Sequence, residues 1–208
     1  MDNDCPAAES ALRASVDRQF VSALPLGAYG GKITLIRDRE SADRAVETLC
    51  GECVLGFDTE TKPSFRRGQH YNTALVQLAS NSAVYLFQLA HCGGVEALLP
   101  LFESDSPLKV CLGVADDIRR LGSSKKFSPA GFFELSEATR AIGVIDCGLR
   151  KLCAIFLSIR ISKGEQTSNW AKDILSETQL RYAATDAWVS LRIYEEAVRL
   201  RSLGVLAK

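Results

Sequence analysis

Two carboxylates stand one residue apart at the end of an apolar run. The run begins at Val54, and Asp58 and Glu60 follow within the same stretch. Strand side chains alternate in direction, so a strand here would point both carboxylates to the same side of a sheet. Two negative charges held that close repel each other unless a hard cation lies between them. An isolated Asp-x-Glu is more commonly a polar loop after a strand, so the meaning of the pair depends on its partners.

A tyrosine and an aspartate form a second pair near the C-terminal end of the chain. Tyr182 and Asp186 are four residues apart in an amphipathic stretch that begins at Ser176. On a helix this spacing places both on one face, about 6 Å apart along the axis. Ser176 with Gln179 three residues later predicts a capping box at the helix start, and the neighbouring alanines allow close packing. A core tyrosine with a surface carboxylate would show the same spacing.

The pattern of apolar residues predicts the elements that must position these side chains. We expect strands at 32–37, 54–58, 73–79, 84–89 and 109–114. The short links between the second, third and fourth strands predict an antiparallel meander, and a helix at 94–102 would return the fifth strand parallel. Further helices are expected at 41–49 with Ser41 as cap, from Asp117 onward, and at about 149–157.

Length and charge limit the classes of protein that this chain can belong to. Its 208 residues fit one domain, which we place at 28–208 after an N-terminal arm at 1–27. The composition, 47% hydrophobic and 24% charged, is that of a soluble globular protein. Lysine plus arginine equals aspartate plus glutamate, 25 each, so no overall basic field attracts a polyanion. Binding of nucleic acid must therefore depend on local patches or on metals.

The first residues and the cysteines indicate the compartment. The N-terminus lacks the pattern of a signal peptide and no apolar run is long enough to span a membrane, so we predict a cytosolic, cytoplasmic protein. The seven cysteines are then expected as reduced thiols. Cys50 and Cys53 have the spacing of a redox motif or zinc knuckle, but no second pair completes a tetrahedral site. We interpret them as structural thiols at a helix-to-strand turn.

Three segments together resemble a known family. Residues 55–60 (LGFDTE), 113–121 (GVADDIRRL) and 182–187 (YAATDA) resemble the three exonuclease motifs of the DEDD 3′-5′ exonuclease superfamily, in its tyrosine-bearing (DEDDy) branch. The nearest resemblance is to ribonuclease D and Werner-type exonuclease domains, over residues 30–200. It implies an α/β, ribonuclease H-like fold with a mixed five-stranded sheet flanked by helices, three strands antiparallel and the rest parallel. The acid of the second motif falls four residues after the glycine, at Asp117 rather than Asp116.

The resemblance also implies a reaction and a role for each side chain. The reaction is hydrolysis of nucleic acid from a free 3′ end to nucleoside 5′-monophosphates, with two divalent ions, Mg²⁺ or Mn²⁺, as cofactors. Asp58 would bridge both ions, and Glu60 and Asp186 would complete the site that activates water. Asp117 would hold waters of the second ion, and Tyr182 would orient the attacking water.

Basic and aromatic side chains are candidates for contacts to the substrate. The loop at 62–71 directly follows the first acidic pair, so its cations could meet a phosphate and its aromatic rings could stack on a base. An ordinary solvated hairpin loop is the alternative. The residues that we expect to bind substrate are Phe65, Arg66, Arg67, Lys163 and Trp170. Lys125 and Lys126 are further candidates for binding phosphate.

The sequence also allows two other functions, and it leaves the choice between RNA and DNA open. A non-catalytic nucleic-acid or protein-binding module could keep the fold, although such proteins usually lose an acid and this chain has all four. A structural calcium site is a third interpretation, but the acids lack the spacing of an EF-hand loop. The expected partner is a single-stranded 3′ end of RNA or DNA. The sequence leaves that choice open, because contacts to a 2′-hydroxyl cannot be assigned from spacing.

Overall fold

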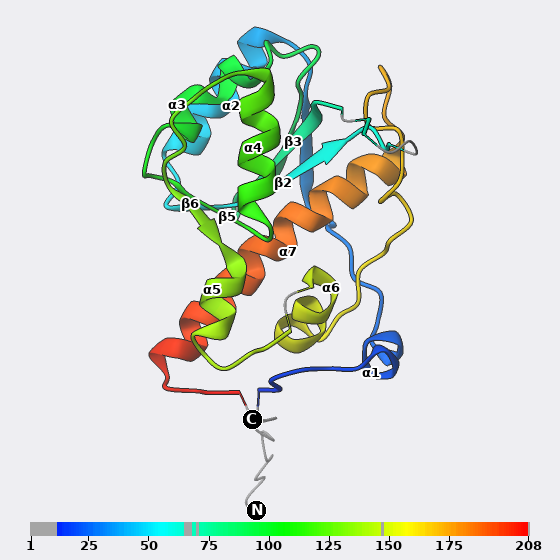
Figure 1. The fold of residues 1–208 in the computed structure, drawn as a ribbon, viewed down its shortest axis with the longest axis vertical. Helices are drawn as coiled ribbons and strands as arrows, with labels where there is room; N and C mark the ends of the chain where they lie inside the picture. The colour runs from blue at the N-terminus through cyan, green and yellow to red at the C-terminus, as the bar shows by residue number, and fades with distance from the viewer. Residues whose placement is uncertain (1–11, 65–67, 70, 147, 208) are drawn as a thin grey trace, which may run out of the picture.

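Six strands form one sheet, flanked by helices, in the computed structural model. The structure describes residues 12–64, 68–69, 71–146 and 148–207 (Figure 1). Within the sheet the strand order is β1-β4-β3-β2-β5-β6. The strands are β1 Lys32–Ile36, β2 Val54–Thr61, β3 Thr73–Ala79, β4 Ala83–Gln88, β5 Leu108–Cys111 and β6 Phe132–Glu134. β3 runs antiparallel to β2 and β4, and the other three pairs are parallel.

The predicted α/β class, the meander β2-β3-β4 and the parallel return of β5 are confirmed. The expected count of five strands is wrong, because β6 adds a sixth strand beside β5. β6 has three residues and follows a turn-rich stretch, so it is too short to show a periodic pattern. β2 also continues through both acids to Thr61 instead of ending at Asp58.

The helices pack on both faces of the sheet. They are α1 Arg18–Ala23, α2 Arg39–Cys50, the 3-10 turn η1 Val95–Leu98, α3 Leu99–Phe102, α4 Val114–Ser124, α5 Leu135–Arg140, α6 Leu149–Leu152, the π-helical segment η2 Cys153–Leu157 and α7 Glu177–Ser202. One core joins α2, α3 and α4 to one face of the sheet, and a second core joins the first half of α7 to the other face (Figure 1). Within the described ranges, no helix combines the length and apolarity needed to cross a membrane.

Two predicted helix caps have different outcomes. The capping box of α7 is confirmed, because Ser176 Oγ accepts from the Gln179 N–H at 3.2 Å and Gln179 Oε1 accepts from the Ser176 N–H at 3.0 Å. The cap of α2 is Asp38, whose carboxylate accepts from the Ser41 N–H at 2.7 Å. Ser41 therefore lies inside the helix, and its prediction as the cap is wrong. A carboxylate at the helix start also interacts favourably with the helix dipole.

The cysteines divide into an exposed pair and a buried group. Cys50 and Cys53 lie at the turn between α2 and β2, as expected, and both are exposed. They follow the last buried residue of α2, Leu49, and precede the buried part of β2. Cys92, Cys111 and Cys153 are buried, and all five of these thiols are free. Packing therefore explains the buried cysteines but not the exposed pair.

α7 lies unusually close to β2. A Cβ atom added to Gly56 would lie 2.0 Å from the carbonyl oxygen of Ala187. Ala183, Ala184 and Ala187 are completely buried on the same face of α7. Small side chains on both elements therefore allow this approach, as the alanines beside Tyr182 predicted. Gly56 is two residues before Asp58 and faces the same side of the sheet, so the approach also sets the distance between α7 and the acids.

The substitution Gly56→Ala is expected to destabilise the protein by at least about 3 kcal/mol, because the methyl group meets backbone atoms of α7 that cannot rotate away. Denaturant unfolding measures the effect. The control is Gly122→Ala inside α4, where an added Cβ meets nothing within 4 Å. That control should stabilise the protein by about 0.5–1 kcal/mol. Equal stability of both variants would contradict the close approach.

Candidate active site

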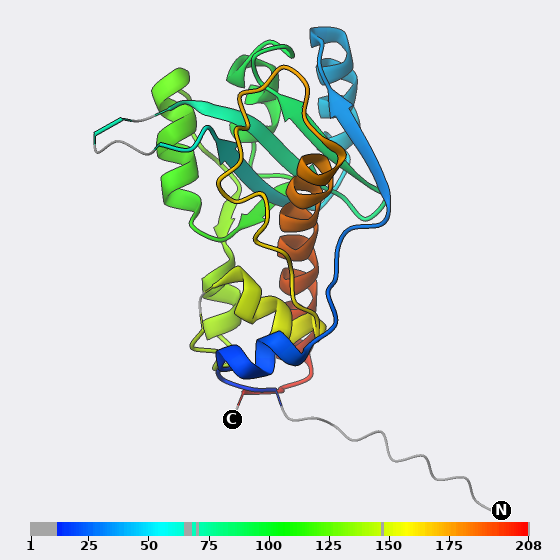
Figure 2. The same ribbon diagram turned by 90° about the vertical axis from the view of Figure 1, so that its right-hand side faces the viewer.

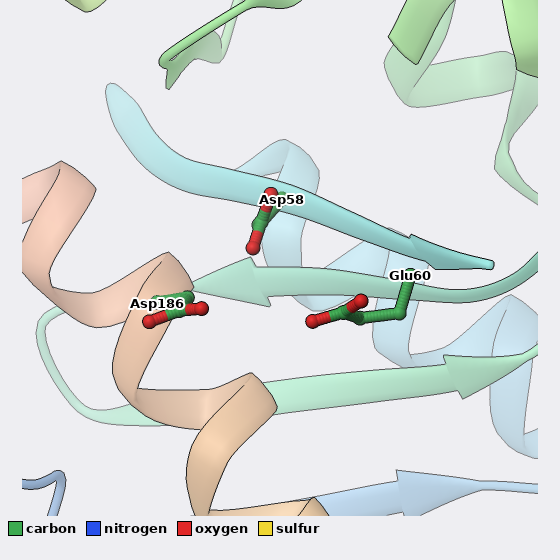
Figure 3. Close-up of side chains that lie close together, drawn as sticks. All are labelled: Asp58, Glu60 and Asp186. Carbon is green, nitrogen blue, oxygen red and sulfur yellow. The ribbon is translucent and has the colours of Figure 1, made fainter. Parts of the chain in front are cut away.

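Three carboxylates from two elements gather at one place. One oxygen each from Asp58, Glu60 and Asp186 lies within 4.8 Å of the others. Asp58 and Glu60 project from the same face of β2, and Asp186 projects from α7 towards them (Figure 3). The first two are half-buried and Asp186 is buried. The alternation of β2 and the packing of α7 thus bring together acids that are far apart in the sequence.

Burial and mutual repulsion raise the pKa values of these carboxyls. Burial raises the pKa of Asp58 well above its usual range, and the charges of Asp186 and Asp117 add to this. Burial, followed by the charge of Asp58, raises the pKa of Glu60 to about 10. The pKa of Asp186 rises to about 7 through burial, opposed by a hydrogen bond from Tyr182. Hard oxygen ligands whose charges repel one another suit a divalent cation, so the residues fit a metal site.

Asp117 lies beside this group and not within it. Its buried carboxylate accepts a hydrogen bond from Thr59 Oγ1 at 2.7 Å. Burial raises its pKa to about 6, although the Thr59 hydrogen bond acts in the opposite direction. The neighbouring Asp116 is 68% exposed and pairs with Arg119 at 2.9 Å. Of the two adjacent aspartates, therefore, Asp117 is the one that faces the acids.

Tyr182 is fixed on both sides. Its hydroxyl donates a hydrogen bond to the Asp186 carboxylate, and its ring packs on Trp170 with centroids 6.0 Å apart. Burial raises the pKa of Tyr182, and the charges of Asp186 and Glu60 raise it further. The phenol is thus a protonated hydrogen-bonding group whose direction is set by the packing of its ring.

Trp170 does not lie where a base could stack on it. The indole is completely buried in the core between α7 and the sheet, together with Leu75 and Ala183. The expectation that Trp170 binds substrate is incompatible with this burial. The polar residues around Trp170 suggested an exposed loop, but a large apolar ring gains more from the core. Its observed contact is with Tyr182, which it supports.

The acids and Tyr182 line a cleft of about 910 Å³. Lys163 is exposed and lines the same cleft. Phe65, Arg66 and Arg67 lie outside the described residues. The other walls come from the segment after η2, α1 and the start of α6, and the sequence alone did not place α1 or α6 near the acids.

The described part of the 62–71 loop lines a different cavity. Lys62 and Tyr71 line a space of about 430 Å³ next to His91 and Lys172. The Lys62 ammonium lies 5.0 Å from the centre of the Tyr71 ring, so these two side chains contact each other. Neither residue lines the cleft above the acids.

Two further polar residues lie beside the site and were missed from the sequence. Gln77 of β3 lies directly opposite Asp58 in the sheet, is completely buried and has no hydrogen-bond partner for either amide atom in the described part of the chain. Glu134 accepts from the N–H groups of Gly113 and Val114 at 2.9 and 3.1 Å, which fixes the start of α4 near Asp117. A glutamine within an apolar strand could have drawn attention to Gln77, since buried polar atoms without partners are uncommon.

Comparisons with known proteins agree with this geometry. A family model described as 3′-5′ exonuclease matches residues 33–199. An exonuclease mut-7 homolog of Aedes aegypti is 27% identical over 194 residues, which cover 78% of this chain and 26% of the relative. Ribonuclease D of Haemophilus influenzae is 28% identical over 204 residues, covering 85% of this chain and 50% of the relative.

The fold is also similar to a solved structure. The Nibbler EXO domain of Aedes aegypti superposes with a TM-score of 0.77 at 23% identity, over 87% of this chain and 95% of that one. The chain spans about a quarter of the mut-7 homolog and half of ribonuclease D. The family match extends over β1 to α7 and includes all four acids and Tyr182. The chain therefore belongs to the 3′-5′ exonuclease family.

Proposed function

We propose that the chain is a metal-dependent 3′-5′ exonuclease that shortens a nucleic-acid strand from its free 3′ end. The observation that carries the proposal is the convergence of Asp58, Glu60 and Asp186 in one cleft. Asp117 and Tyr182 lie beside them, and membership of the exonuclease family supports the same reaction. In that reaction the oxygen of water bonds to phosphorus, the bond to the 3′ oxygen of the preceding nucleotide breaks, and that oxygen takes up a proton. The products are a nucleoside 5′-monophosphate and a strand with a new 3′-hydroxyl.

Two divalent ions, Mg²⁺ or Mn²⁺, are the proposed cofactors. Asp58, Glu60 and Asp186 would hold them, and Asp117 would contribute through water. When bound, such ions neutralise the charge of the phosphate and lower the pKa of water. A donor set of carboxylate oxygens without histidine favours Mg²⁺ or Mn²⁺ over zinc.

The protein itself supplies position and hydrogen bonds. We assign Tyr182 the orientation of the attacking water, because its hydroxyl lies at Asp186 and its ring is held by Trp170. The raised pKa of the phenol favours this role over removal of a proton. Thr59 Oγ1 donates to one carboxylate oxygen of Asp117 and so orients this carboxylate.

The competing hypothesis is a non-catalytic module that binds nucleic acid or protein. Asp58, Glu60, Asp186 and Tyr182 line one cleft, and the charge of Asp117 acts on Asp58 from beside it. This arrangement favours the enzyme, since a binding module would not need this costly cluster of buried charges. The substrate that we propose is a single strand. The name of one relative, ribonuclease D, supports RNA, and DNA is the alternative that the assay below includes.

Replacing either Asp58 or Asp186 by asparagine is expected to lower activity by at least about 1,000-fold, because each change removes a charge that holds the ions. The measurement is the Mn²⁺-dependent release of mononucleotides from matched RNA and DNA strands that end in a 3′-hydroxyl. Asp117→Asn should also lower activity. Asp116→Asn is the matched control and should retain activity, because Asp116 faces solvent. Full activity of the Asp58 and Asp186 variants would exclude the proposed function.

Tyr182→Phe is expected to lower kcat about 10- to 100-fold while metal binding and stability change little. The ring contact with Trp170 survives in this variant, and only the hydroxyl is lost. Tyr194→Phe is the control, since Tyr194 lies on the same helix but packs on Phe133. Equal kcat for the two variants would show that the Tyr182 hydroxyl has no part in the reaction. Steady-state kinetics with one single-stranded substrate measures kcat for both variants.

The stability of the metal-free protein is expected to fall as the pH rises from about 4 to 7. The pKa values of Asp117 and Asp186 are raised to about 6 and about 7, whereas unfolded aspartates titrate near 4. The folded state therefore holds more protons in this window, and the free energy of unfolding decreases with pH. Glu60, with a pKa of about 10, extends the decrease to higher pH.

Thermal unfolding in EDTA measures this decrease. Mn²⁺ at pH 8 should restore the Tm, because a cation favours the ionised carboxyls. Asp186→Asn should reduce the slope of Tm against pH. A metal-free Tm that increases between pH 5 and pH 7 would contradict the pKa shifts.

A further inference from the structure

The cleft above the acids has a second, basic side. Besides the three carboxylates, it is lined by Arg18 of α1, Arg150 and Lys151 of α6, and Lys163 of the segment after η2. Figure 2 shows α1 and the α6 region together at the end of the molecule away from α2. Negative and positive side chains thus face one space but come from different parts of the fold.

Three of these cations have no carboxylate partner in the part of the chain that the structure describes. Lys151 pairs with Asp146 at 2.7 Å, which neutralises its charge. Among the described residues, Arg18, Arg150 and Lys163 form no ion pair, although acids line the same cleft. The contact of Arg150 is a donation from its Nε to the Ile161 carbonyl at 3.3 Å, which leaves its charge uncompensated. We call these three residues the basic wall.

The segment that carries Arg18 is fixed to the rest of the protein. Before α1, the Val16 N–H donates to Asp146 Oδ2 at 2.7 Å, and Val16 and Val21 pack on Ala154 of η2. After α1, the Gly27 N–H donates to the Arg160 carbonyl at 2.9 Å. Arg18 therefore has a defined place at the cleft, although it precedes residues 33–199, which the family model matches.

The proposed reaction limits which phosphate the basic wall could meet. A strand that is cut at its last linkage has one nucleotide on the 3′ side, and that nucleotide ends in a hydroxyl. Every phosphate other than the one attacked therefore lies on the 5′ side. The acids and their cations would hold the attacked phosphate, and the cleft of about 910 Å³ has room beside them.

We infer that Arg18, Arg150 and Lys163 bind the phosphates on the 5′ side of the cleaved bond, and that the N-terminal segment is thereby part of the substrate-binding surface. This inference rests on the proposed function. In this inference the basic wall holds the strand in the cleft and takes no part in breaking the bond. The wall also explains how a chain without net charge holds a polyanion, since it concentrates three unpaired cations at one cleft.

Binding of a fluorescent single-stranded 10-mer in EDTA, measured by anisotropy at several salt concentrations, tests the wall without turnover. Each of Arg18→Ala, Arg150→Ala and Lys163→Ala is expected to reduce the magnitude of the negative slope of log K against log salt by about 0.7. Each should also weaken the affinity at 0.1 M salt about fivefold. Arg18→Lys should retain most of the slope. Lys32→Ala removes one exposed charge that does not line the cleft and should leave the slope unchanged. Unchanged slopes in all three alanine variants would overturn the inference.

Kinetics on two substrates separates the basic wall from the chemistry. For the 10-mer, Arg18→Ala should lower kcat/KM about fivefold with little change in kcat. For a dinucleoside monophosphate, which has only the attacked phosphate, kcat/KM should not change. An equal loss on both substrates would overturn the inference, because the wall would then act on the attacked phosphate. If the wild-type protein binds the 10-mer but never hydrolyses it with Mn²⁺, the proposed function fails, while the salt slopes still decide whether the wall binds phosphate.

Discussion

The close approach of α7 to β2 is the constraint on which the site depends. Gly56 has no side chain, so the Ala187 carbonyl can lie where a Cβ atom would otherwise be. That approach is what allows Asp186 to reach the carboxylates of Asp58 and Glu60. A carboxylate side chain is short, so a displacement of the helix by the width of a methyl group would separate the acids. The buried alanines of α7 and the glycine of β2 thus have a functional consequence as well as a packing role.

The site concentrates groups that cost stability. The pKa values of Asp58, Glu60, Asp117 and Asp186 are all raised, chiefly by burial. Gln77 lies opposite Asp58 with both amide atoms buried and without a partner in the described chain. The two apolar cores on either side of the sheet offset these costs and hold the backbone that carries the acids. A site arranged for cations is expected to be least stable when they are removed.

The charges are separated within one cleft. Acids from the sheet and α7 face cations from α1, α6 and the segment after η2. The protein has no net charge, but this separation of charges produces an electric field within the cleft. The overall composition does not show that field. The acids belong to the region shared with the 3′-5′ exonuclease family, whereas Arg18 precedes it. The proposed reaction and the proposed holding of the strand thus depend on different segments of the chain.

Much of the fold could be predicted from local pattern. The alternation of β2, the meander with β3 and β4 and the capping box of α7 depend on neighbours in the sequence, and the structure has all of them. The order of the three motifs was also enough to indicate the family, because each motif lies within one element. β6 and the cap of α2 were missed, since a three-residue strand and a choice between Asp38 and Ser41 leave little local evidence.

The sequence by itself determined which side chains share a face of one element: Asp58 with Glu60 on a strand, and Tyr182 with Asp186 on a helix. The tertiary structure alone decided which faces meet. It placed Trp170 in the core and brought Arg18 of the N-terminal segment to the cleft. The physical reason is that periodicity records the direction of a side chain relative to its own backbone, whereas contacts between distant segments depend on how whole elements pack.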